Sequence, residues 1–257
     1  MSEENRLQAV KRVLVTQMTT ANNKGPYDKL SEKYNLDIDY RSFTEVRPVE
    51  SKDFRKQKVK LEEFTAIVLT SKSAADHFFR MCEEMRYKVP TDLKYFCTSE
   101  AIALYLQKHI VYRKRKVFFG KRTLADLKPA LLKHKAKEKF LMPCSNFGGK
   151  GFSNFLREEN FEFKEAMMYE AVSSDLSDLE NVFYDIIVFF SPLSLNSLHE
   201  NFPQFQQKNT RIAAFGTQTS KAVTDRNLIL DIEAPSPNCP SMTMALEKYI
   251  KLTLEKA

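Results

Sequence analysis

The sequence predicts an α/β protein of two similar domains, each a parallel β-sheet flanked by helices. Residues 66–79 and 186–199 each begin with a continuously apolar run, AIVL or IIVFF, as strands buried on both faces do. In both copies a small hydroxyl residue and an amphipathic helix follow the run. A second unit of the same kind follows each copy, at 94–106 and at 211–223. This repetition indicates two related sheets.

Short apolar runs alternate with helical patterns along the rest of the chain. The predicted strands are 12–17, 37–43, 65–70, 94–97, 117–119, 138–143, 161–172, 185–190, 211–215 and 228–232. The predicted helices are 26–35, 71–85, 98–109, 123–134, 151–160, 192–202, 217–225 and 241–256. Residues 44–60 are polar and contain Pro48, which predicts a linker or a short helix.

Counting strands predicts that one domain is inserted into the other. Residues 1–43 supply only two strands, and the section 172–257 supplies three, so together they make a five-stranded outer domain. Residues 48–166 then form the inserted domain, also with five strands. Connectors near 41–47 and 166–171 form a two-strand link, and we expect an active-site cleft between the domains.

Composition excludes several classes of protein. Hydrophobic residues make up 43% of the 257, enough for a folded core, and no apolar run approaches membrane-spanning length. The charged start, residues 1–12, has no hydrophobic segment behind it, so it is not expected to be a secretory signal. Cys82, Cys97, Cys144 and Cys239 are scattered without a CxxC pair, which is typical of free thiols and predicts a cytoplasmic protein.

The net charge of +7 is unevenly distributed. Residues 112–122, YRKRKVFFGKR, contain six bases and no acid. Such a run is compatible with a solvated face, with nucleic-acid binding or with a polyanionic small molecule. No nucleic-acid-binding motif accompanies it, and its aromatic residues alternate with bases as in a half-buried strand, which weakens the nucleic-acid hypothesis.

Several motifs together resemble one enzyme family. They are VLVTQ (13–17), AIVLTSKSA (66–74), MMYEAV (167–172), VFFSPLSLNSL (188–198), IAAFGTQTSKAV (212–223) and APSPNCPSMTMAL (234–246). In order and spacing the chain resembles the uroporphyrinogen-III synthase family across nearly its whole length. The resemblance implies two domains, one discontinuous, joined by two strands.

The resemblance also implies an activity. The family closes the linear tetrapyrrole hydroxymethylbilane to uroporphyrinogen III, with loss of water and inversion of the last pyrrole ring through a spiro intermediate. It implies a cofactor-free, metal-free hydro-lyase of haem biosynthesis that is monomeric and binds neither nucleic acid nor membrane. A transient contact with the upstream hydroxymethylbilane synthase is compatible with it. A non-catalytic tetrapyrrole- or polyanion-binding module of the same fold is the alternative.

The candidate binding groups lie where apolar strands stop before helices. N–H groups at helix N-termini and nearby hydroxyls suit a substrate rich in carboxylates. The candidates are Thr16, Thr70, Ser71, Ser73, Thr98, Ser99, Ser191, Ser194, Gly216, Thr217 and Thr219. Helix capping explains each Ser or Thr equally well.

Three of the candidate roles come from the resemblance. Tyr169 matches the tyrosine of the family's V-Y-x-T segment and is the candidate catalytic residue, a neutral proton donor to the departing hydroxyl. Thr219 matches the second threonine of the family's G-P-T-T loop, which implies a hydrogen bond to the same region of the substrate. Gly216, in that loop, would allow the backbone to approach the substrate closely.

The chain departs from the family at two basic positions. Gln17-Met18 stand where the first strand often ends in Arg-Pro, and Cys144-Ser145-Asn146 stand where an Arg-Gly pair is common. Lys72, Lys150 or the bases of 112–122 are the candidates to replace them. The departures favour the binding module.

Overall fold

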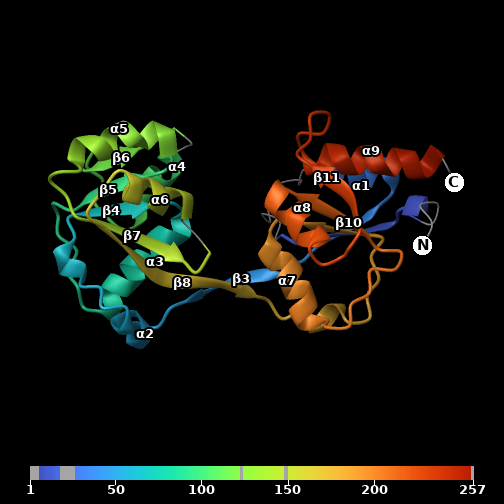
Figure 1. Ribbon diagram of the computed structural model, residues 1–257, viewed down its shortest axis with the longest axis horizontal. Helices are drawn as coiled ribbons and strands as arrows, with labels where there is room; N and C mark the ends of the chain where they lie inside the picture. Colours follow the sequence, from blue (N-terminus) through green and yellow to red (C-terminus); the bar gives the residue numbers. More distant parts are fainter. Residues whose placement is uncertain (1–5, 18–26, 122–123, 148–149, 256–257) are drawn as a thin grey trace. The chain divides into compact units, whose positions relative to one another are not determined.

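The computed structural model describes residues 6–17, 27–121, 124–147 and 150–255 (Figure 1). Its backbone contacts divide the chain into two compact units. Unit 1 comprises residues 1–45 and 172–257, and unit 2 comprises residues 46–171. Each unit contains a sheet with helices on both faces, so the predicted α/β class is confirmed.

Unit 1 is built on a five-stranded sheet of order β11-β10-β9-β1-β2 with all pairs parallel. Its strands are β1 (Arg12–Val15), β2 (Asp37–Tyr40), β9 (Ile186–Phe189), β10 (Arg211–Phe215) and β11 (Leu230–Ala234). Its helices are α1 (Asp28–Tyr34), η4 (Ser177–Leu179), α7 (Pro192–Asn201), α8 (Thr217–Thr224) and α9 (Met242–Glu255).

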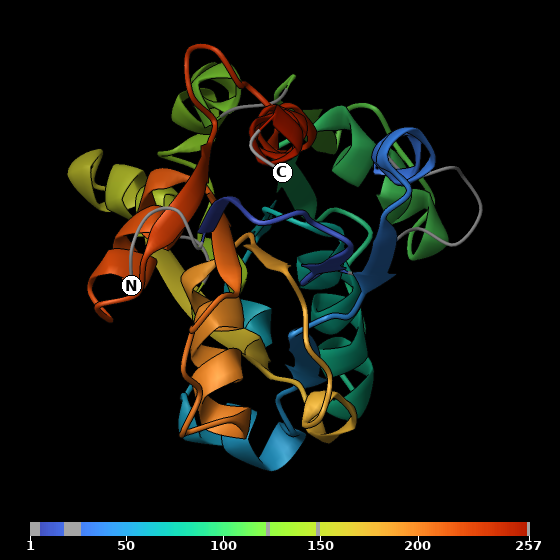
Figure 2. The same cartoon turned by 90° about the vertical axis from the view of Figure 1, so that its right-hand side faces the viewer.

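Alternating residues of these strands serve two apolar cores. Val13 and Val15 pack with Leu30 of α1 and Leu246 of α9. Leu14, from the same strand, points to the opposite core, where residues of α7 and α8 cover the sheet. Figures 1 and 2 show α9 and α7 on opposite sides of the strands. Burial on both faces explains why the strands are continuously apolar.

Unit 2 is built on a six-stranded sheet of order β3-β8-β7-β4-β5-β6, in which β3 begins and β8 ends two residues outside the range 46–171. Its strands are β3 (Thr44–Pro48), β4 (Ala66–Leu69), β5 (Lys94–Cys97), β6 (Val117–Phe119), β7 (Phe140–Ser145) and β8 (Phe163–Ser173). Its helices are α2 (Ser51–Lys56), η2 (Leu61–Glu63), α3 (Lys72–Glu84), α4 (Glu100–Tyr105), η3 (Leu106–Lys108), α5 (Leu124–His134) and α6 (Lys150–Glu158).

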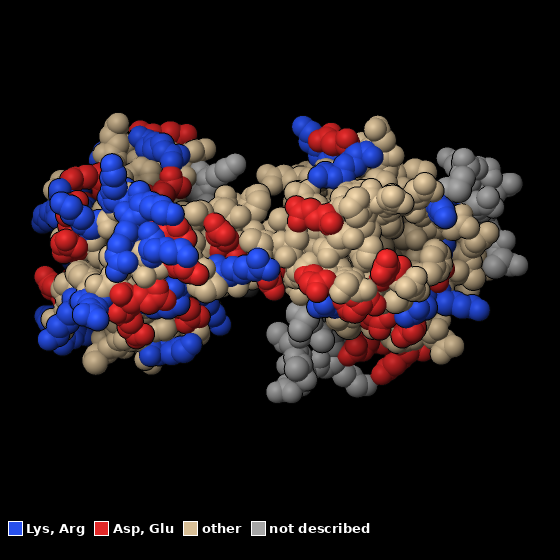
Figure 3. Space-filling view, turned by 90° about the horizontal axis from the view of Figure 1, so that it is seen from below, with Lys and Arg blue, Asp and Glu red and all other residues tan. Residues whose placement is uncertain are grey.

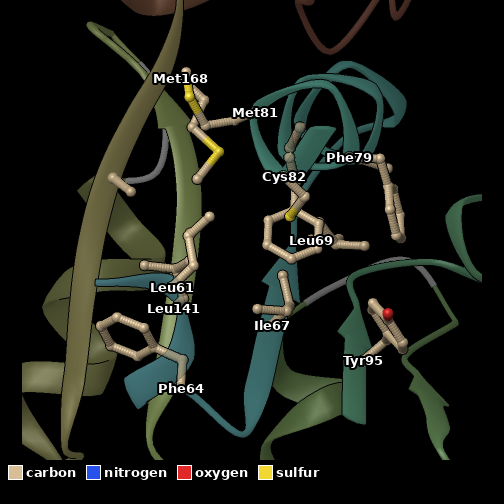
Figure 4. Close-up of a cluster of buried hydrophobic side chains, with 14 of the residues drawn as sticks. Leu61, Phe64, Ile67, Leu69, Phe79, Met81, Cys82, Tyr95, Leu141 and Met168 are labelled. Atoms are coloured by element: carbon tan, nitrogen blue, oxygen red, sulfur yellow. The ribbon is translucent and has the colours of Figure 1, made fainter. Parts of the chain in front are cut away.

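Two cores also flank this sheet. One packs the α3 face, where Ile67, Leu69, Met81 and Met168 meet (Figure 4). The other packs α5 and α6 against the opposite face, around Phe96 and its neighbours. Both faces of β4 are therefore buried, as its run AIVL predicted.

The prediction for residues 44–60 was incomplete. The segment contains α2, but Thr44–Pro48 forms β3, so the sheet of unit 2 has six strands where five were expected. β3 is an edge strand whose residues are mostly exposed, so it lacks the apolar pattern that identified the others. Pro48 is tolerated there because an edge strand leaves one row of backbone groups unpaired. Within the basic segment 112–122 the strand covers only Val117–Phe119.

Candidate functional site

The candidate donors of unit 2 lie at the carboxyl ends of β4 and β5. Ser71 caps α3, because its Oγ accepts a hydrogen bond of 3.0 Å from the amide of Ala74. Thr98 Oγ1 donates to the carbonyl of Thr70 at 3.3 Å, which joins the two strand-end loops. Ser99 precedes α4 without a side-chain cap, and Ser73 is half-buried in the first turn of α3.

Tyr169 of β8 meets this row of donors. Its hydroxyl lies 3.3 Å from Ser71 Oγ, and its ring stacks on His77 of α3 with centroids 4.9 Å apart and planes inclined by 15°. The residue is 8% exposed. The structure thus brings together Tyr169 and Ser71, which lie 98 positions apart in the chain.

Arg80 holds this arrangement from the next turn of α3. Its Nη2 donates to the carbonyls of Val49 (2.9 Å) and Met168 (3.0 Å), and its Nε donates to Nδ1 of His77 (3.3 Å). Because Nδ1 accepts, a neutral His77 ring carries its proton on Nε2. Burial, together with the positive charge of Arg80, lowers the pKa of His77. Sequence reasoning missed both residues, since only their spacing on α3 connects them.

The matching row of unit 1 repeats the capping geometry. Ser191 caps α7 by accepting from the amide of Ser194 at 3.2 Å, with φ −154° against −155° at Ser71. The hydroxyls of Ser194 and Thr16 are buried and donate to the carbonyls of Ser191 (2.7 Å) and Val188 (2.8 Å). Both hydroxyls are therefore already paired with backbone.

The loop after β10 completes the row of unit 1. Gly216 has φ 89°, a conformation that side chains rarely adopt, and a Cβ there would meet no atom within 4 Å. Open space together with positive φ indicates that backbone geometry selects glycine here. Thr217 is exposed at the start of α8, whereas Thr219 is 2% exposed and faces the interior.

Among the described residues the cysteines could act as thiols, and they and the histidines as metal ligands, but burial holds Cys82 and Cys97 in the protonated form. All four cysteines are free and buried, and burial raises the pKa of Cys82 and of Cys97 to about 12. Within the described ranges, no group of three His, Cys, Asp or Glu side chains could hold a metal ion. Nor is any helix of the described part long and apolar enough to cross a membrane.

A family model described as uroporphyrinogen-III synthase HemD matches residues 27–244. The chain belongs to the uroporphyrinogen-III synthase family. The match spans both units and includes Tyr169 and every strand-end donor named above except Thr16. The family's reaction is part of haem and tetrapyrrole biosynthesis.

Solved uroporphyrinogen-III synthase structures share the fold. The synthetase from Helicobacter pylori matches with a TM-score of 0.59 and 17% identity, covering 94% of this chain and 99% of that one. A mutant synthase from Thermus thermophilus matches with a TM-score of 0.52 and 13% identity, covering 96% and 100%. At such identities the likeness establishes the fold alone. No curated protein matches the chain in sequence.

The residues that stand at the altered basic positions, and the lysines considered as their replacements, lie in different surroundings. Gln17 is exposed after β1, whereas Met18 lies outside the described residues. Asn146 binds the backbone of β8, donating to the carbonyl of Ala171 (3.1 Å) and accepting from its amide (2.9 Å). Lys72 lies with its Nζ 5.2 Å from the ring centroid of Tyr105. The side chain of Lys150 lies outside the described residues.

The free energy of unfolding should decrease as the pH falls from about 7.5 to about 5.5. Burial is the main cause that lowers the pKa of His77, His134 and His199 below 6.5. As the pH falls, the histidines of the unfolded chain therefore bind protons before those of the folded chain, and this favours unfolding. The stability that is present above pH 6.5 is lost as the pH falls toward the pKa values of the folded state. Urea denaturation followed by circular dichroism at constant ionic strength measures this. A flat or rising profile in that window would contradict it.

Proposed function

We propose that the chain is a uroporphyrinogen-III synthase that cyclises hydroxymethylbilane, with loss of water and inversion of the last pyrrole ring through a spiro intermediate. Family membership supports the reaction class. The observation that carries the proposal is the Tyr169 hydroxyl beside Ser71 at a row of strand-end donors. We further propose functional domains 1–43 with 172–257 and 48–166, connected near 41–47 and 166–171.

Tyr169 is the proposed proton donor to the departing hydroxyl. A phenol donates a hydrogen bond without adding negative charge beside an acidic substrate. The hydroxyl of Ser71 is within hydrogen-bond reach of the phenol oxygen of Tyr169 and orients that phenol. The stacked ring of His77 limits the movement of the Tyr169 ring. Ordering the two ends of a flexible chain contributes more to such a cyclisation than acid catalysis, up to about 7–11 kcal/mol in favourable cases.

The remaining donors are proposed to bind carboxylates. Each hydrogen bond to a charged group contributes about 1.5–3 kcal/mol, so a few suffice. In unit 2 the candidates are Thr70, Ser71, Ser73, Thr98 and Ser99. In unit 1 they are Thr16, Ser191, Ser194, Gly216, Thr217 and Thr219. Since Thr16 and Ser194 already donate to backbone carbonyls, their contribution to binding would be as hydrogen-bond acceptors or through neighbouring amides.

Product analysis tests the proposal. Freshly made hydroxymethylbilane is incubated with the protein, and the type III and type I isomers are separated after oxidation to the porphyrins. Without an enzyme, ring closure gives the type I isomer. An excess of type III is the expected result. A product that is type I alone, at the rate of the buffer control, would reject the synthase.

The binding module is the second candidate, and the altered basic positions favour it. Gln17 carries no charge, and Asn146 is committed to the backbone of Ala171. A binding module predicts that hydroxymethylbilane or a stable tetrapyrrole binds while the type III isomer does not form. Titration calorimetry with uroporphyrin III alongside the product assay distinguishes the two functions.

Ser71→Ala should lower both stability and turnover, whereas Ser241→Ala should lower stability alone. Each serine accepts a hydrogen bond from the backbone amide three residues along, at the start of a helix, so either replacement costs about 1 kcal/mol of folding free energy. Only Ser71 lies beside the Tyr169 hydroxyl. Urea denaturation and the rate of type III formation are measured on both variants. Equal losses of rate would show that Ser71 acts through stability alone.

A further inference from the structure

Unit 2 contains a cavity that lies away from Ser71 and Tyr169. Its volume is about 360 Å³, within the range of small-molecule sites. Its walls include Phe79, Cys82, Tyr87, Leu93, Tyr95 and Ile110. These side chains are aromatic or aliphatic, apart from the thiol and the phenol groups.

The cavity and the candidate site lie at opposite ends of α3. Ser71 caps the beginning of this helix, whereas Cys82 and Glu83 in its last turn line the cavity. At about 1.5 Å per residue, the helix separates the two places by roughly 18 Å. Leu93, just before β5, also lines the cavity, which is therefore at the amino edge of the strands. A ligand here would not occupy the candidate catalytic site.

The mouth of the cavity carries basic groups from the segment 112–122. Arg113 and Lys116 line the cavity, as does the exposed Glu83. Lys116 Nζ donates to the carbonyl of Asp92 at 3.0 Å, so it is held in place. Among the described residues no carboxylate pairs with Arg113, whose guanidinium is exposed. Val111 beside it is 82% exposed.

The walls of the cavity present flat rings, and two of their titratable groups are held neutral by burial. Burial raises the pKa of Cys82 to about 12 and also raises the pKa of Tyr95, so both groups stay protonated. Phe79 stacks on His109 with centroids 4.5 Å apart and planes inclined by 7°. Asp76 accepts a hydrogen bond of 2.9 Å from His109, which orients that ring. A flat apolar body fits these walls.

We propose that this cavity binds a small aromatic molecule that carries a single anionic group. The aromatic body would lie against Phe79, Tyr95 and Ile110, and the anion would meet Arg113 at the mouth. A guanidinium binds carboxylate, sulfonate and phosphate groups in a planar, bidentate manner.

The charge of unit 2 supports an anionic ligand. Residues 46–171 contain 26 Lys and Arg against 16 Asp and Glu, a difference of +10, whereas the rest of the chain has 14 against 17, a difference of −3. Figure 3 shows Lys and Arg side chains covering much of the visible face of this unit, at the left. A positive field raises the local concentration of anions near the cavity mouth.

The probe for the test is anilinonaphthalene sulfonate, a fluorescent aromatic monoanion. Titration of the full chain should show one saturable site. Replacing Arg113 by Glu should weaken binding about tenfold, the size of one charge-assisted hydrogen bond. Glu83→Gln should strengthen binding about two- to threefold, because it removes a negative charge at the mouth. The uncharged analogue N-phenylnaphthylamine should bind the wild type and Arg113→Glu equally.

Arg115→Glu is the matched control, because Arg115 belongs to the same exposed segment but does not line the cavity. It should change the affinity less than about twofold. A second internal control is a cavity of about 510 Å³ in unit 1, where Glu180 is the one charged residue among the described residues that line it. Methyl NMR signals of Ile110 and Val111 should shift with the probe, and those of Leu198 and Val182 in the unit 1 cavity should not.

Three results would each overturn the proposal. The first is the absence of saturable binding. The second is equal weakening by Arg113→Glu and Arg115→Glu, which would indicate attraction to the basic segment as a whole. The third is a shift of the unit 1 methyl signals in place of those of Ile110 and Val111. None of these results bears on the synthase activity, whose candidate residues lie at the other end of α3.

Discussion

Tyr169→Phe should lower the rate of type III formation by about tenfold to a hundredfold, the loss of one hydrogen bond to a developing charge. The ring remains, so its stacking on His77 and the packing of β8 are kept. Only the hydroxyl that lies 3.3 Å from Ser71 Oγ is removed. We expect activity to be reduced and not abolished, because departure of the substrate hydroxyl needs little assistance. The measurement is the initial rate of type III product.

The isomer ratio gives this variant a second readout. Hydroxymethylbilane that escapes the enzyme closes to the type I isomer, so the share of type I should rise as the catalysed rate falls. Tyr87→Phe is the matched control, since Tyr87 lies in the same unit but lines the cavity at the opposite end of α3. An unchanged rate in Tyr169→Phe, or the same loss in Tyr87→Phe, would remove Tyr169 from the proposed mechanism.

Much of the fold could be predicted because its strands are buried on both faces. Continuously apolar runs such as AIVL and IIVF are typical of strands in the centre of a parallel sheet. The chain also repeats one capping solution, so Ser71 and Ser191 could be recognised from their place between strand and helix. In contrast, β3 escaped detection because an exposed edge strand has no apolar periodicity.

The candidate site was predictable only in part. Tyr169 and the strand-end donors could be named from a resemblance and from the ends of strands. Arg80 could not, because the groups that it binds outside α3 are the carbonyls of Val49 and Met168, which any residue type would offer. A backbone carbonyl is present at every residue, so the sequence does not show which carbonyls accept side-chain hydrogen bonds. Such contacts can be identified only from the tertiary structure.

Asp231→Ala should lower the free energy of unfolding of unit 1 by about 3–5 kcal/mol. Asp231 accepts hydrogen bonds from Nε and Nη2 of Arg6, and from the amide of Ile212 at 2.8 Å. The two side chains of the ion pair are only 9% and 4% exposed. Removing the carboxylate leaves a buried guanidinium with two carbonyl partners, Lys208 and Thr210, and no counter-charge. The free-energy penalty of the unpaired buried guanidinium is larger than the net contribution of the intact ion pair to stability.

A double variant and an exposed pair separate these contributions. Arg6→Met combined with Asp231→Leu should recover much of the loss, because apolar side chains of similar size replace a buried ion pair at little cost. Asp178→Ala, which breaks the exposed pair with Arg41, should cost less than about 1 kcal/mol. Since the chain has no Trp, urea unfolding is followed by tyrosine fluorescence and far-ultraviolet circular dichroism. A loss below about 1 kcal/mol in Asp231→Ala would show that water reaches the guanidinium and that the pair does not anchor the amino-terminal segment to β11.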